Sequence, residues 1–124
     1  MTFLRFTPVA VLALLLVGCG SGGPGDTAAD FARAAASGDG ERVVELLDPA
    51  MAQSLGPKIS ATVSSQAGEA AAKGGLSEVN ILDETVNGDN ATVRIETVMG
   101  DGSRSEETIQ LRKIDGDWKV VISK

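Results

Sequence analysis

The C-terminal half of the chain alternates apolar and polar residues, and this period of two constrains the fold more than any other feature. Turn sequences rich in Gly, Asp and Asn at residues 87–90, 100–102 and 115–117 divide it into four segments. Their apolar rows are Val79 and Ile81; Ala91, Val93, Ile95, Thr97 and Met99; Ile109 and Leu111; and Trp118, Val120 and Ile122. Because connections this short join antiparallel neighbours, we predict a four-stranded antiparallel meander. Its other face should carry opposite charges, such as Arg94 and Glu96 near Glu107 and Arg112.

The residues before Leu76 follow helical periods, and three helices are expected. They run from Thr27 to Gly38, from Asp39 to Leu47, and between Gly56-Pro57 and Gly74-Gly75. Thr27 and Asp39 are expected to cap the first two helices, and Asp48-Pro49 is expected to end the second. Helices followed by strands predict an α+β fold, in which the N-terminal helices pack on one face of a curved, cone-like four-stranded antiparallel sheet.

The N-terminus has the layout of a bacterial secretory signal. One positive charge, Arg5, precedes the apolar run Val9–Val17, and small residues follow. The run is too short to cross a bilayer as a helix, which takes ~20 apolar residues. Residues 1–18 are therefore predicted to be a signal peptide, residues 19–26 a flexible Gly-rich tether, and residues 27–124 a single α+β domain.

The junction Leu16-Val17-Gly18-Cys19 resembles the lipobox of bacterial lipoproteins. The resemblance implies cleavage between Gly18 and Cys19, a diacylglyceryl thioether on the Cys19 sulfur, and an N-acyl chain such as palmitate. A cysteine suits this chemistry because its thiolate alkylates readily, and two or three acyl chains anchor where one would not. The alternative is a chance cysteine in an ordinary signal peptide. Gly20 stands where an aspartate would retain the protein in the inner membrane, which favours the outer membrane if the cell has one.

The domain itself also resembles a known group. Its motifs are Ala28-Ala29-Asp30-Phe31, the Gly38-Asp39 break, Val44–Pro49, and Ile114–Val120, which contains Gly116-Asp117-Trp118-Lys119. They are similar to the lumazine-binding-like domain of unknown function in bacterial lipoproteins, which has the nuclear transport factor 2-like or cystatin-like cone fold. Aromatic residues that many relatives carry on the first helix are replaced here, so Phe31 and Trp118 are the only aromatics after the signal.

Composition excludes several functions. The chain has no His, no Tyr and one Cys, so imidazole catalysis, His-ligated metal sites and an intrachain disulfide are ruled out. Without the signal, ten basic face seventeen acidic side chains, a net charge of −7 that disfavours nucleic acid. The acidic turns at Asp83 and Asp115 do not fit the spacing of a calcium loop. We expect no metal and no cofactor.

The sequence therefore predicts an envelope lipoprotein, anchored in membrane lipid through Cys19, whose domain is a binding or interaction module. Its partner would be an envelope protein or a small apolar ligand. The candidate pocket residues, which are first of all core candidates, are Phe31, Met51, Ile95, Met99 and Trp118. The alternative is a pocketed carrier or a weak carboxylate-based enzyme, an isomerase or dehydratase using Asp30, with Glu45 behind it. Catalysis is not favoured, because no His or Tyr could polarise a carbonyl opposite that base.

Overall fold

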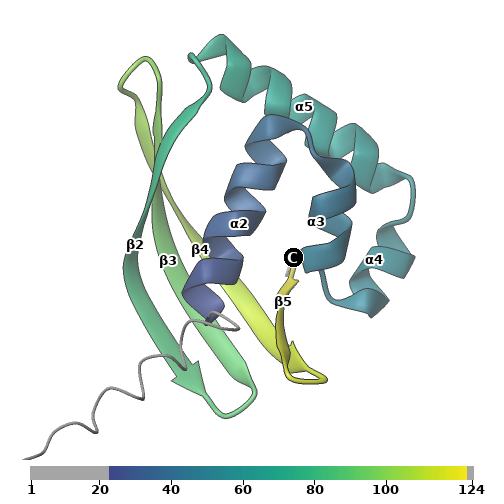
Figure 1. The fold of residues 1–124 in the computed structure, drawn as a ribbon. Coiled ribbons are helices and arrows are strands. Elements are labelled where there is room, and N and C mark those ends of the chain that lie inside the picture. Colours follow the sequence, from purple (N-terminus) through teal and green to yellow (C-terminus); the bar gives the residue numbers. More distant parts are fainter. Residues whose placement is uncertain (1–22, 123–124) are drawn as a thin grey trace, which may run out of the picture.

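The structure, a computed structural model, describes residues 23–122. Four helices come first: α2 (Pro24–Ser37), α3 (Gly40–Leu46), α4 (Pro49–Leu55) and α5 (Lys58–Ala72). Four strands follow: β2 (Leu76–Asn87), β3 (Asn90–Met99), β4 (Arg104–Ile114) and β5 (Asp117–Val121). The helices lie together on one face of the sheet, which confirms the predicted α+β class (Figure 1). The predicted signal peptide, the Gly18–Cys19 junction and the lipid attachment at Cys19 lie outside the described residues.

The sheet is an antiparallel meander in the order β2-β3-β4-β5, as the short turns predicted. The predicted inward row of β3 is buried from Ala91 to Thr97, and Ile109 and Leu111 continue it on β4. The predicted charge pairing across the outer face was wrong in detail. Glu107 is the partner of Ile95 and shares the helix-facing row with Ile109, because residues two apart on a strand point the same way.

The outer face carries two ion pairs across β3 and β4. The Arg94 guanidinium lies 3.0 Å from a carboxylate oxygen of Glu106, and that of Arg104 lies 3.1 Å from Glu96. Neither pair is the predicted one, because the register places Arg94 opposite Thr108 and Glu96 opposite Glu106. Cross-strand charge pairs on this face therefore run diagonally.

The start of one helix differs from the prediction, and one helix was not predicted. The first helix begins at Pro24, with Gly23 as its cap, so Thr27 lies inside it and its hydroxyl donates to the Gly23 carbonyl oxygen. Residues 24–26, assigned to the tether, are thus helical. Helix α4, the third of the four helices along the chain, was not predicted, because Asp48-Pro49 was interpreted only as a break. A capping Asp followed by Pro at the first helical position also starts a helix, and here the Asp48 carboxylate accepts the Ala50 N–H at 2.8 Å.

The core lies between the helices and the inner sheet face. Its buried members are Ala28, Ala34, Val43, Leu47, Ile59, Val63, Ala91, Val93, Ile95, Ile109, Leu111 and Val120. Phe31 and Trp118 are partly buried and pack against this cluster. Met51 and Met99, also expected in the core, are only half-buried. Met51 lies on α4, a helix without a buried residue, and Met99 is the last residue of β3.

The segment between α3 and α4 closes one edge of the sheet. Leu47 forms a parallel bridge with Val120 of β5, and the Asp48 N–H donates to the Val120 carbonyl oxygen at 2.9 Å. The Asp48 side chain is buried, and its second carboxylate oxygen lies 3.0 Å from the guanidinium of Arg112 on β4. This junction ties the helical layer to the sheet.

Candidate functional site

A mostly apolar hollow lies among the helices, and we call it the Phe31 cleft. Its volume is about 380 Å³. It is lined by Phe31, Ala35, Val43, Leu47, Leu55, Lys58, Ile59, Thr62, Val63, Gln66 and Ile122. An apolar cleft of this size with a few polar groups is the usual form of a small-molecule site.

Helical spacing explains how the walls are built. Phe31 and Ala35 lie one turn apart on α2, and Ile59, Val63 and Gln66 follow one another along a single face of α5. Ile59 and Val63 are buried, whereas Gln66 is exposed. The cleft therefore has an apolar floor and a polar margin, to which the exposed Lys58 and Thr62 also belong.

A second, smaller hollow adjoins the cleft and shares Phe31, Ala35 and Gln66 with it. Its volume is about 250 Å³. It reaches the sheet, where Met99 and Glu107 contribute to its lining. Glu107, which the sequence had placed on the outer face, thus brings a carboxylate to the helix-facing side next to the apolar site.

The predicted pocket residues do not lie in one pocket. Phe31 lines both hollows and Met99 lines the smaller one. Ile95 is fully buried in the core. Trp118 lines neither hollow and belongs to a separate polar groove, and Met51 is half-buried on α4. Sequence reasoning missed the α5 wall, which the recurrence of Ile59, Val63 and Gln66 at helical spacing could have shown.

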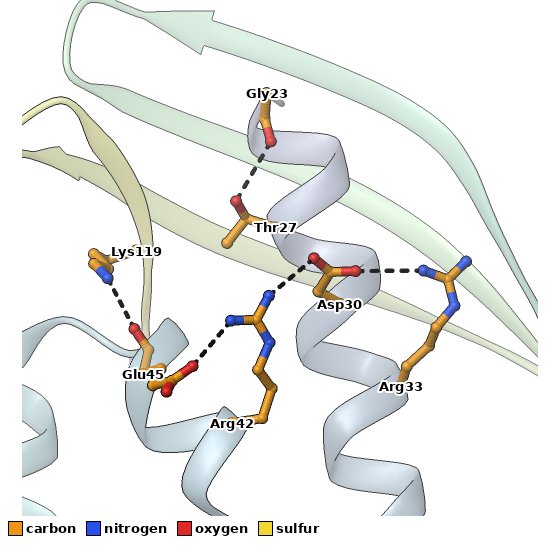
Figure 2. Close-up of polar contacts among 7 residues, drawn as sticks. All are labelled: Gly23, Thr27, Asp30, Arg33, Arg42, Glu45 and Lys119. Atoms are coloured by element: carbon orange, nitrogen blue, oxygen red, sulfur yellow. Dashed lines mark hydrogen bonds and ion pairs between the residues drawn. The ribbon is translucent and has the colours of Figure 1, made fainter. Parts of the chain in front are cut away.

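The polar groove lies between α2, α3 and the β4–β5 turn and has a volume of about 510 Å³. Of its charged residues, Figure 2 shows Asp30, Arg42, Glu45 and Lys119. The Arg42 guanidinium lies 3.0 Å from a Glu45 carboxylate oxygen and 3.4 Å from one of Asp30. The Lys119 ammonium donates to the Glu45 backbone carbonyl at 2.8 Å, near the C-terminus of α3. The Asp30–Arg42 ion pair links α2 to α3, and the Lys119 hydrogen bond links α3 to β5.

Asp30, the candidate base of the enzyme alternative, takes part in this network with both carboxylate oxygens. Its second carboxylate oxygen lies 3.6 Å from the Arg33 guanidinium, so each oxygen faces an arginine, and its side chain is 45% exposed. The hydrogen bond to Glu45 and the charge of Asp30 raise the pKa of Arg42 above its ordinary value. Asp30 does not line the Phe31 cleft, so the acid and the apolar site are separate.

Within residues 23–122, no helix combines the length and the apolar character that crossing a bilayer requires. Over the same range, no three carboxylate or thiol side chains are close enough together to hold a metal ion.

Comparisons with known proteins show one family and several similar solved structures. The profile of a family described as "Domain of unknown function (DUF4878)" matches residues 17–121. A Campylobacter jejuni crystal structure, provisionally named an NTF2-like transpeptidase, is 26% identical with a TM-score of 0.75. The match covers 81% of this chain and 98% of that one.

A solution structure of RPA3114, a SEC-C motif containing protein from Rhodopseudomonas palustris, is 20% identical with a TM-score of 0.50, over 73% of this chain and 69% of that one. No curated protein matches the sequence. The likeness to the Campylobacter protein supports an NTF2-like fold.

Proposed function

Because the chain belongs to the DUF4878 family and has an NTF2-like fold, we propose that it is a lipid-anchored envelope protein whose domain is a binding module. The observation that carries the binding role is the Phe31 cleft, a mostly apolar hollow with a polar margin. Its occupant would be a small apolar ligand or an apolar side chain of an envelope protein. Both would gain ~25 cal/mol for each Å² of apolar surface removed from water.

The anchor is proposed on sequence grounds. The apolar run Val9–Val17 leads directly into Gly18-Cys19, and the family match begins at Val17, so the cleavage junction lies inside the matched region. Two or three acyl chains on Cys19 would hold the domain at the membrane. With Gly20 next to Cys19, the proposed location is the periplasmic face of the outer membrane, or the outer face of the cell membrane where no outer membrane exists.

Cys19→Ser tests the anchor. The substitution removes the sulfur that would carry the lipid, so the protein should move from the membrane fraction to the fraction free of membranes. Ser21→Ala, two residues away in the tether, is the matched control and should leave fractionation unchanged. A Cys19→Ser protein that stays with the membranes would refute the anchor.

Catalysis is not part of the proposal. The name of the Campylobacter protein includes a transpeptidase activity, but this chain has no His, and its single Cys is the proposed lipid site. Acyl transfer needs a nucleophile hydrogen-bonded to a base, and within the described residues no hydrogen bond joins the Thr62 hydroxyl of the cleft to the neighbouring Lys58. Asp30, the carboxylate of the enzyme alternative, is half exposed and paired with two arginines outside the cleft.

Binding can be measured with an environment-sensitive apolar dye such as anilinonaphthalene sulfonate. Ala35→Leu places a larger side chain in the cleft and should reduce dye binding severalfold. Ala61→Leu makes the same change on the exposed side of α5 and should not affect it. Asp30→Asn should also leave dye binding intact, because Asp30 is outside the cleft. Equal dye affinity for Ala35→Leu and the natural protein would exclude the cleft.

A further inference from the structure

The two edges of the sheet differ in their backbone pairing. The β5 edge is closed by Leu47 and Asp48. At the other edge, β2 has twelve residues, and over residues 23–122 no backbone-to-backbone hydrogen bond joins it to any segment other than β3. Figure 1 shows β2 at the border of the sheet. Helix α2 packs against β2 as well as against β3. An open edge of this length presents unpaired N–H and C=O groups, which match those of another extended chain.

The charges on β2 have one sign. The strand carries Glu78, Asp83 and Glu84 and has no Lys or Arg. None of these three carboxylates forms an ion pair within the described residues, whereas the outer-face arginines of β3 and β4 are all paired. Glu84 accepts the Gly25 N–H at 3.3 Å, at the N-terminus of α2, and so has a structural role. Glu78 lies opposite the apolar Val98, and Asp83 lies opposite Arg94, whose guanidinium is ion-paired with Glu106 of β4 instead.

The strand also exposes apolar side chains. Of the five large hydrophobic residues that are well exposed in the described part of the chain, three lie on β2: Ile81 at 44%, Leu82 at 40% and Val86 at 49%. Apolar residues on an open edge strand would add contact area to backbone pairing.

We propose that the β2 edge binds an extended, basic segment of a partner protein by strand addition. The partner's backbone would pair with β2, and its Lys or Arg side chains would face Glu78 and Asp83. Pairing with a second copy of this chain is disfavoured, because two β2 strands would bring like charges together. The register shifts between Leu76 and Glu78 and between Ile81 and Asp83 interrupt the strand, so the regular stretch Asp83–Asn87 is the main pairing segment.

Hydrogen exchange of the full chain, kept in a neutral detergent, tests the proposal. The probe is a capped peptide of alternating Val and Lys, added at low salt. We expect it to slow the exchange of amides in β2, above all in residues 83–87. The same peptide with Glu in place of Lys should not bind, and one with N-methylated backbone amides should bind at least about tenfold more weakly, because it cannot donate to the edge.

Charge reversal on the strand separates this site from general attraction to an acidic protein. The double variant Glu78→Lys and Asp83→Lys should weaken binding of the Lys peptide about tenfold or more, since two attractions become repulsions. The matched control, Glu41→Lys and Asp117→Lys, changes the net charge equally at exposed sites away from β2. Four results would each overturn the proposal. Both double variants could weaken binding equally, or the N-methylated peptide could bind as tightly as the parent peptide. The peptide could protect only amides outside β2, or a second copy or the N-terminal segment could already protect the β2 amides without peptide.

Discussion

Asp48 holds together three parts of the structure, and replacing it with Ala is expected to destabilise the domain. One carboxylate oxygen accepts the Ala50 N–H at 2.8 Å and caps α4, and the other lies 3.0 Å from the Arg112 guanidinium. The Asp48 side chain is only 6% exposed, whereas that of Arg112 is 53% exposed. The carboxylate is therefore largely shielded from water, but its cationic partner is not.

The magnitude follows from these two contacts. Loss of a helix cap costs about 1 kcal/mol. The ion pair adds about 0.5 to 1 kcal/mol, because the solvent around Arg112 screens it. Asp48→Ala should therefore lower the free energy of unfolding by about 2 kcal/mol, which lowers the midpoint of thermal unfolding by about 10 °C in a domain of this size. Asp48→Asn retains an oxygen for the Ala50 N–H and should cost about half as much.

Urea unfolding followed by the fluorescence of Trp118, the one tryptophan of the chain, measures these differences. Arg112→Gln and the double variant with Asp48→Asn complete a cycle, in which the coupling energy should not exceed about 1 kcal/mol. Two results would refute this prediction. The first is a free energy of unfolding of Asp48→Ala within about 0.5 kcal/mol of that of the natural protein. The second is an equal loss of stability in Asp48→Asn and Asp48→Ala, which would assign the whole effect to the charge.

Two further predictions concern the turns. Gly100→Ala should destabilise the domain by about 2 to 3 kcal/mol in thermal unfolding, because the new Cβ would overlap the Gly74 carbonyl oxygen. The control Gly40→Ala has free space around the new Cβ and should cost almost nothing. Similar unfolding of both variants would contradict this prediction. The Ser103 hydroxyl and N–H, at 2.6 and 2.9 Å, lower the pKa of Asp101 below its ordinary 3.8, and Ser103→Ala should raise it in an NMR titration. Because the folded-state pKa is the lower one, this contribution to stability is present above about pH 4 and is lost as the pH falls through the folded pKa, and Ser103→Ala should reduce it. An unchanged pKa would show that the hydroxyl does not act on Asp101.

The strands could be predicted from the sequence because apolar and polar residues alternate along them, and on β3 this alternation matches the burial from Asn90 to Ile95. Val93 and Ile95 are completely buried as expected, and each turn lies where Gly, Asp and Asn cluster. Pairing across strands was harder, because register depends on the exact residues in each turn. That is why Arg94 contacts Glu106 and why Glu107 turned out to lie on the inner face.

The cleft was predictable only in part. Phe31 was an evident candidate because it is one of two aromatics after the signal, and it does line the apolar site. Trp118 was chosen for the same reason, but β5 places it in the polar groove. Composition alone does not predict that position. The missing element was α4: its residue Leu55 lines the cleft, and its existence depends on reading Asp48-Pro49 as a start as well as a stop.

Leu47 and Asp48 connect the cleft to the sheet. The Leu47 side chain lines the Phe31 cleft, and its backbone forms the bridge to Val120 that closes the β5 edge. The Asp48 carboxylate caps the start of α4 and forms an ion pair with Arg112 of β4. A ligand that moved α3 and α4 apart would therefore also strain the β5 edge. No residue of β2 lines the cleft, and the hydrogen bond from the Gly25 N–H to Glu84 that ties β2 to α2 lies at the N-terminus of that helix, away from Phe31 and Ala35. Cleft binding and strand addition at β2 should accordingly be independent, so that saturating dye leaves the affinity for the basic peptide unchanged.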